Sequence, residues 1–152
     1  MQKKKEGRKM KKSFSVVALL LTVVLLLSSC GKDDSNDSSS KSAGIEGTWK
    51  LTDVKSAGLS AEELKAARDM VTSGQMQETF VFKSGKATMH IKNASYDPPM
   101  ETGYNLNYTL NGNKLSMTEE GTSDTQTIDC TISGNTMELN MDGGILVFTR
   151  QN

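Results

Sequence analysis

The side chains in this sequence whose types could do chemistry are few: two cysteines, one histidine and, beyond residue 44, two pairs of adjacent acids. His90 falls on the polar side of an alternating segment, where a lone exposed imidazole lacks the partners of a general base. Cys130 lies in an apolar segment, where a thiol is usually inert packing. Glu62-Glu63 belongs to a helix start and Glu119-Glu120 to a turn, and neither pair has an acid–base partner. The sequence therefore predicts no catalytic residue, no metal site and no cofactor, and a protein that is not an enzyme.

The second thiol, Cys30, stands in a different setting. It ends the sequence Leu27-Ser28-Ser29-Cys30, which closes an apolar run over residues 14–27, and Lys11-Lys12 precedes that run. A basic start, a short apolar segment and small residues before a cleavage point are the parts of a secretory signal. The segment resembles the lipobox of bacterial lipoproteins. The resemblance implies that the Cys30 thiol takes a diacylglyceryl group, that the chain is cut before Cys30, and that the new amine is acylated.

A transmembrane helix is the alternative interpretation of the apolar run. Spanning a bilayer takes about 20 apolar residues, whereas the run over residues 14–27 is shorter and charged residues follow it closely. The pattern therefore favours a signal peptide over residues 1–29, with Met10 as an alternative start because Met10-Lys11-Lys12 is itself a standard signal start. Each buried CH₂ group contributes about 0.8 kcal/mol, so three acyl chains on Cys30 would hold the protein at the membrane permanently.

Residues 30–44 follow as a segment rich in serine and aspartate. It contains no apolar residue larger than alanine apart from Cys30, so it cannot bury enough surface to order itself, and we expect a flexible tether. Lys32, Asp33 and Asp34 resemble the surface-export signal of Bacteroidota-type lipoproteins, and the alternative is a patch that only adds solubility. The resemblance implies lipid anchoring in the outer membrane with exposure at the cell surface, and the periplasmic face is the alternative location.

The overall charge of zero hides an uneven distribution. Seven of the 18 basic residues but only one of the 18 acids lie within the first twelve positions, so a processed chain keeps 11 basic and 17 acidic residues. Its net charge is then about −6. Binding to nucleic acid requires a cluster of Lys and Arg that displaces counterions. No such cluster remains after processing, so the sequence excludes DNA and RNA as partners, and it does not identify a protein partner.

Residues 45–152 form one predicted domain in which apolar and polar residues mostly alternate, as in half-buried strands. Turn pairs such as Ser84-Gly85 and Gly134-Asn135 separate the segments. The predicted strands cover residues 47–54, 77–83, 86–92, 102–110, 114–119, 125–133, 136–141 and 145–151. Ser60 and Glu63 form a capping box that starts a helix over residues 61–72. We therefore predict an all-β fold: an eight-stranded antiparallel up-and-down barrel with one short helix between the first and second strands.

The first and last strands carry a family resemblance. Gly47-Thr48-Trp49 matches the Gly-x-Trp signature of lipocalins and the wider calycin group, and Val147-Phe148-Thr149-Arg150 resembles the end of small bacterial lipocalin-like lipoproteins. The resemblance implies that Trp49 and Arg150 pack together and close one end of the barrel. A guanidinium over an indole contributes about 0.5–2 kcal/mol. The chain differs from typical lipocalins because it lacks their disulfide and has a helix in place of a long loop after the first strand.

If Trp49 points inward, the alternation predicts the residues that line the interior. The candidate ligand-lining residues are Leu51, Phe82, Met89, Tyr104, Leu106, Tyr108, Met117, Ile128 and Leu139. Such a lining is apolar with two phenol groups, which is typical of sites for small apolar or amphipathic ligands. The same pattern is equally typical of a filled core, in which case the barrel would serve as a protein- or glycan-interaction module, for instance an inhibitor. The sequence leaves both functions open and does not identify the ligand.

Overall fold

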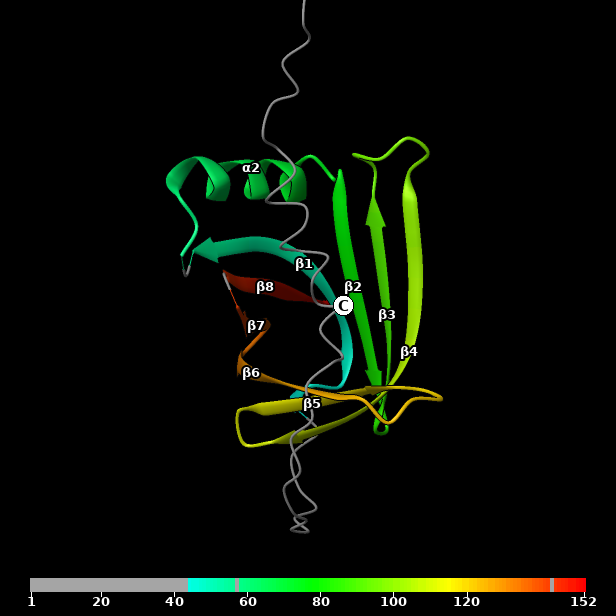
Figure 1. Cartoon of the computed structure of the whole chain (residues 1–152). Helices are drawn as coiled ribbons and strands as arrows, with labels where there is room; N and C mark the ends of the chain where they lie inside the picture. The colour runs from blue at the N-terminus through cyan, green and yellow to red at the C-terminus, as the bar shows by residue number, and fades with distance from the viewer. Residues whose placement is uncertain (1–43, 57, 143) are drawn as a thin grey trace, which may run out of the picture.

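The computed structural model describes residues 44–56, 58–142 and 144–152 (Figure 1). Its strands join in chain order into a closed barrel in which the last strand pairs with the first. The elements are β1 (Gly47–Ser56), α2 (Ala61–Thr72), β2 (Met76–Lys83), β3 (Lys86–Asn93), β4 (Met100–Asn111), β5 (Lys114–Glu119), β6 (Thr125–Ser133), β7 (Thr136–Met141) and β8 (Gly144–Gln151). The predicted antiparallel up-and-down barrel with one helix after the first strand is confirmed.

The alternating residue pattern produces the alternating burial that a barrel wall requires. Along β3, each inward residue is buried and nearly every outward residue is exposed. Tight turns join β2 to β3 and β6 to β7, where Gly85 and Gly134 adopt the positive φ angles of 76° and 57° that such turns need. The strands β1, β2, β3, β4 and β8 extend one or two residues beyond the predicted bounds, because backbone pairing with a neighbour continues past the apolar pattern.

A bulge in β1 is the main irregularity of the barrel. The register between β1 and β8 shifts between Leu51 and Asp53, so that both Leu51 and Val54 are buried although they are three residues apart. Before the bulge, β1 pairs with β2 as far as Lys50, and after it β1 pairs only with β8. Figure 1 shows β1 strongly curved, and a bulge of this kind bends the strand that carries it.

The helix α2 lies across one end of the barrel, beside β1 and the start of β2 (Figure 1). Its start is specified locally: the Ser60 side chain accepts a hydrogen bond from the backbone of Glu63, and the Glu63 carboxylate accepts one from the backbone of Ser60. The predicted capping box and helix bounds are therefore confirmed. Ala67 and Val71 are buried, so the helix covers this end of the barrel with its apolar face.

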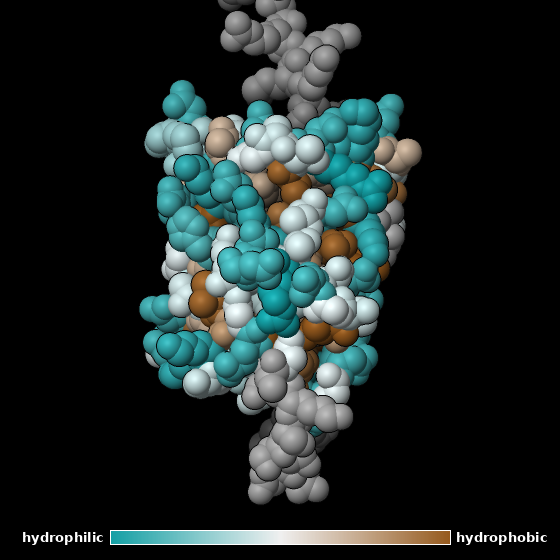
Figure 2. Space-filling model, turned by 180° about the vertical axis from the view of Figure 1, so that it is seen from behind, coloured by the Kyte–Doolittle hydropathy of each residue, from teal (hydrophilic) through white to brown (hydrophobic). Residues whose placement is uncertain are grey.

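The apolar residues are concentrated inside the barrel. Seen from behind, the surface shows apolar areas only as separate patches among polar side chains (Figure 2). Val81 and Tyr96 are the large hydrophobic side chains of the described residues that are exposed, at 42% and 39%. The outer wall carries paired hydroxyl groups instead, such as Ser116 with Thr127 at 2.9 Å. Because the apolar side chains lie inside the barrel, a site for an apolar ligand would also lie there.

Candidate ligand-binding interior

The structure places the predicted lining residues on the inner face of the barrel. Eight of them are buried and Tyr104 is partly exposed; the buried ones are Leu51, Phe82, Met89, Leu106, Tyr108, Met117, Ile128 and Leu139. They come from every strand except β8, which contributes Leu146 and Phe148. The interior is therefore built from all parts of the described chain.

Aromatic rings fill the part of the interior around β1, β2 and β8. The rings of Phe80 and Phe82 stack with centroids 5.3 Å apart, and Phe148 meets Phe80 edge-on at 5.4 Å. Tyr108 meets Phe82 edge-on at 4.9 Å. Such contacts each contribute about 0.5–1.5 kcal/mol beyond the burial of area. This part of the barrel is a packed core.

Trp49 and Arg150 lie at the end of the barrel away from α2. The guanidinium carbon of Arg150 lies 4.2 Å from the centre of the Trp49 ring. The Trp49 indole nitrogen donates a hydrogen bond to the carbonyl of Ile45 at 2.6 Å, and Arg150 donates to the carbonyls of Glu46 and Gly44. The two side chains thereby attach the segment before β1 to the end of β8.

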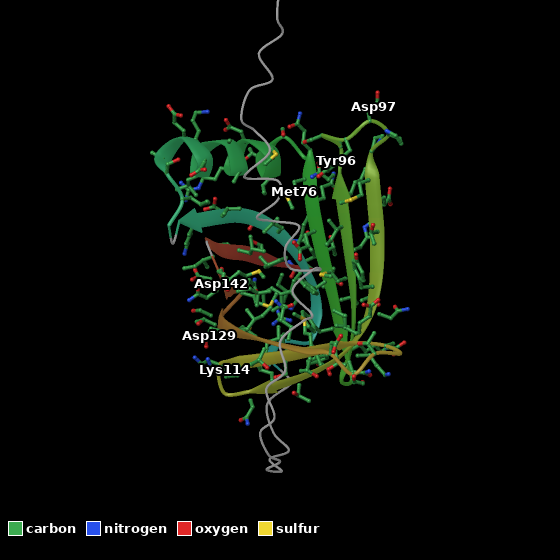
Figure 3. All side chains as sticks on the ribbon, in the orientation of Figure 1. Met76, Tyr96, Asp97, Lys114, Asp129 and Asp142 are labelled. Carbon is green, nitrogen blue, oxygen red and sulfur yellow. The ribbon has the colours of Figure 1, made fainter. Side chains whose placement is uncertain are left out.

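The opposite end, which α2 covers, is less tightly closed. The pairing of β4 with β5 begins only at Leu106, so the first part of β4 extends past β5. On this part Met100, Thr102 and Tyr104 share the inward side with Leu106 but are only partly buried. Figure 3 shows Met76 at the start of β2 at this end, near Tyr96 and Asp97 on the loop between β3 and β4. The inward side of β4 is thus partly accessible to solvent at this end of the barrel.

Two polar side chains in the interior were not among the predicted lining residues. Glu78 is 2% exposed and Asn93 is 1% exposed, and both belong to the inward-facing sets of β2 and β3. The signal was present in the sequence, since Glu78 has the same parity as Phe80 and Phe82. It was missed because charged residues are almost never fully buried, and an alternating pattern is normally followed through its apolar members.

The environment of Glu78 determines its protonation. Burial raises the pKa of its carboxyl group from 4.5 to about 7, and no other group contributes to the shift. No hydrogen bond or ion pair connects this carboxylate with another described residue. A buried carboxyl group without a partner is uncommon, because the desolvation of the charge is left uncompensated. A hydrogen-bond donor on a bound molecule would therefore stabilise the ionised form of Glu78.

The remaining reactive side chains lie on both faces of the barrel wall. His90 is exposed on the outer face, with its Nε2 atom 3.1 Å from the Glu101 carboxylate. Cys130 is a buried free thiol whose pKa burial raises to about 11, so it is protonated at neutral pH. Burial and, to a smaller extent, the nearby Glu46 carboxylate raise the pKa of the Tyr108 hydroxyl, which makes no hydrogen bond of normal geometry. Within the described ranges, no group of His, Cys, Asp and Glu residues could hold a metal ion.

The predicted anchoring residues cannot be placed. Cys30, Lys32, Asp33 and Asp34 lie outside the described residues, as do the predicted signal peptide and nearly all of the predicted tether. In the part of the chain that the structure describes, no helix has both the length and the apolar character needed to cross a membrane.

The closed eight-stranded barrel with a covering helix and an apolar interior defines a lipocalin-like protein. The family model of the lipocalin-like domain matches residues 45–139, and the chain belongs to this family. The resemblance carried by Gly47-Thr48-Trp49 is thereby confirmed. No curated protein matches the chain.

Three solved structures are similar to the chain at low sequence identity. An uncharacterized protein from Bacteroides eggerthii is 14% identical with a TM-score of 0.48, and the match covers 70% of this chain and 98% of that one. A lipocalin-like protein from Bacteroides uniformis is 12% identical with a TM-score of 0.47, covering 71% and 99%. Fatty-acid-binding protein 1 from Echinococcus granulosus is 14% identical with a TM-score of 0.37, covering 72% and 99%.

Proposed function

We propose that this protein binds a small apolar or amphipathic ligand non-covalently inside its barrel. Lipocalin-like families consist typically of binding proteins rather than enzymes, and membership of the family supports a role in binding rather than in catalysis. The location that goes with the proposal is the outer membrane, with the lipid anchor on Cys30 and the domain at the cell surface. Lys32-Asp33-Asp34 favours the surface over the periplasmic face.

The observation that carries the proposal is the presence of unpartnered polar groups inside an otherwise apolar barrel. The side-chain amide nitrogen of Asn93 and the hydroxyl group of Tyr108 are buried without a hydrogen-bond partner. The Glu78 carboxyl group is buried on the same inner face without an ion-pair partner among the described residues. A buried polar group that stays unpaired costs about 1–3 kcal/mol. A filled structural core gains nothing from such groups, whereas a ligand site uses a few polar groups to orient an otherwise apolar molecule.

The distribution of packing supports a ligand position near α2. The aromatic cluster of Phe80, Phe82, Tyr108 and Phe148 occupies the part of the barrel near the Trp49 end. The partly exposed inner side of β4, at Met100 and Thr102, lies at the other end. Methionine side chains such as Met89 and Met117 adapt easily to ligands of different shape. We therefore expect the ligand to enter beside α2 and to lie with its apolar part against the Phe80–Phe82 cluster.

Native mass spectrometry of the protein purified from its own host tests the proposal. We expect a species heavier than the processed chain, whose extra mass disappears after extraction with organic solvent. A second test adds apolar probes: a ligand at 100 times its Kd raises the stability by about 2.7 kcal/mol, so the melting temperature should rise with probe concentration. A constant melting temperature across fatty acids, sterols and porphyrins, together with the mass of the processed chain alone, would contradict the proposal.

A further inference from the structure

Glu78 and Asn93 are neighbours on the inner wall of the barrel. In the pairing of β2 with β3, Glu78 lies opposite Ile91 and Met76 lies opposite Asn93. Glu78 and Asn93 are therefore diagonal neighbours on the same face, and no hydrogen bond joins their side chains. Both belong to the end of the barrel at which β4 is partly exposed, since Asn93 pairs with Met100 and Ile91 pairs with Thr102.

Their unused hydrogen-bonding capacities are complementary. The side-chain oxygen of Asn93 already accepts a hydrogen bond from the backbone of Ser95 at 2.9 Å, which leaves the amide nitrogen as a donor without a partner. An ionised Glu78 offers only acceptors. A single group that donates to Glu78 and accepts from Asn93 satisfies both residues.

The interior contains no positive charge to balance Glu78. Glu78 and Asn93 are the buried polar or charged residues of the described chain, and every described Lys, Arg and His side chain is partly or fully exposed. The partly exposed Arg150 lies over Trp49 at the other end of the barrel. A ligand carboxylate at this position would therefore face the Glu78 carboxylate without a counter-ion, which is unfavourable at low dielectric.

We propose that Glu78 and Asn93 bind the hydroxyl headgroup of an amphipathic ligand, and that they select such a ligand against one that ends in a carboxylate. The ligand hydroxyl donates its hydrogen bond to a Glu78 carboxylate oxygen and accepts one from the amide nitrogen of Asn93. An ammonium headgroup satisfies Glu78 but cannot accept from Asn93, because it has only donors. The inference rests on the proposed function and specifies the chemical class of its ligand.

The test compares three probes of equal chain length, 1-decanol, decanoate and decylamine, by displacement of an apolar fluorescent probe from the purified full chain at pH 8. We expect 1-decanol to bind about tenfold more tightly than decanoate, which corresponds to one well-paired buried hydrogen bond. In Glu78→Gln the preference should disappear through tighter binding of decanoate, because the repulsion is removed. In Asn93→Asp, which keeps the acceptor for Ser95 but loses the donor, binding of 1-decanol should weaken about tenfold.

Glu62→Gln is the matched control, because Glu62 is exposed on α2 and the substitution removes the same charge. Its probe preference should equal that of the unmodified chain. Tighter binding of decanoate or decylamine than of 1-decanol, or an unchanged preference in folded Glu78→Gln, overturns the hydroxyl inference while the ligand-binding function stands. Failure of all three probes and of the fluorescent probe to bind overturns the proposed function as well. If Glu78→Gln does not fold, the unmodified chain and Asn93→Asp still decide the headgroup preference.

Discussion

The guanidinium carbon of Arg150 lies 4.2 Å from the centre of the Trp49 ring, which joins the last strand of the barrel to the first. The pair is also opposite in the register of β1 and β8. The Arg150 side chain donates in addition to backbone carbonyls before β1, so the guanidinium satisfies groups that would otherwise be left without partners. Two residues that are 101 positions apart in the sequence are thus in contact where the last strand pairs with the first.

The effects of substituting Trp49 and Arg150 on the free energy of unfolding should not be additive. We expect Trp49→Ala to lower the free energy of unfolding by about 3–5 kcal/mol, the range for a large buried aromatic residue. Arg150→Ala should lower it by less, and the double variant by less than the sum of the two, because both changes remove the same contact. Chemical denaturation of the four proteins measures the cycle. Strict additivity would show that the stacking contributes nothing to closure.

A side chain at position 47 should destabilise the protein, because it would collide with the Arg150 guanidinium. The φ angle of Gly47 is +122°, and a Cβ atom built on this residue would lie 2.9 Å from Nη1 of Arg150. We expect Gly47→Ala to cost about 1–3 kcal/mol in unfolding free energy from backbone strain, with a further loss from the displaced guanidinium. Gly44→Ala is the control, since a Cβ atom there meets nothing within 4 Å and the residue has no positive φ. Equal melting temperatures for the two variants would contradict this explanation.

Much of the barrel could be predicted because its determinants are local. The alternation along β3 and the glycines in the turns specify where strands run and reverse, and Ser60 with Glu63 specifies the start of the helix. The bulge in β1 was not predicted, although Asp53 interrupts the alternation of Trp49 and Leu51 and Val54 resumes it with the opposite parity. Such a change of parity is also typical of the end of a strand. The pairing of β1 with β8 depends on contacts across the whole domain, and it was predicted from the number of successive strands together with the family resemblance.

The candidate site was predicted only in its apolar part. Residues such as Met89 and Leu106 were identified by parity, because apolar residues at a spacing of two face one side of a strand. Glu78 and Asn93 have the same parity, but burial of unpaired polar residues is unfavourable and a pattern-based prediction assigns them to solvent. The two residues to which we assign headgroup recognition are therefore those that the rule of polar residues facing solvent misplaces.

Lipid anchoring is tested on a residue outside the described part of the chain. If Cys30 carries acyl chains, Cys30→Ala should remove the protein from the membrane fraction, because the replacement has no thiol to modify. Cell fractionation with a high-salt wash measures the distribution, and a Ser28→Ala variant, which keeps a small residue before the cleavage point, serves as the control. Complete recovery of Cys30→Ala with washed membranes would contradict the anchor.

The buried carboxyl group of Glu78 should make stability depend on pH in a direction opposite to that of a salt-bridged acid. Its pKa is raised from 4.5 to about 7 in the folded protein, so between these values the folded state binds more protons than the unfolded state. The free energy of unfolding should therefore fall as the pH rises from 4.5 through 7 and level off above, by roughly 3 kcal/mol in total.

Glu78→Gln isolates this contribution, because the raised pKa values of Tyr108 and Cys130 concern groups that stay protonated in this range. The lowered pKa of Glu63 has the opposite effect, at lower pH, and is present in both proteins. We expect the variant to be more stable than the unmodified protein at pH 8, and this difference to shrink toward pH 5. Urea denaturation at a series of pH values measures both curves. Parallel curves would mean that Glu78 is solvated or paired in the folded protein. A hydroxyl-bearing ligand that binds Glu78 should likewise make the two curves more nearly parallel.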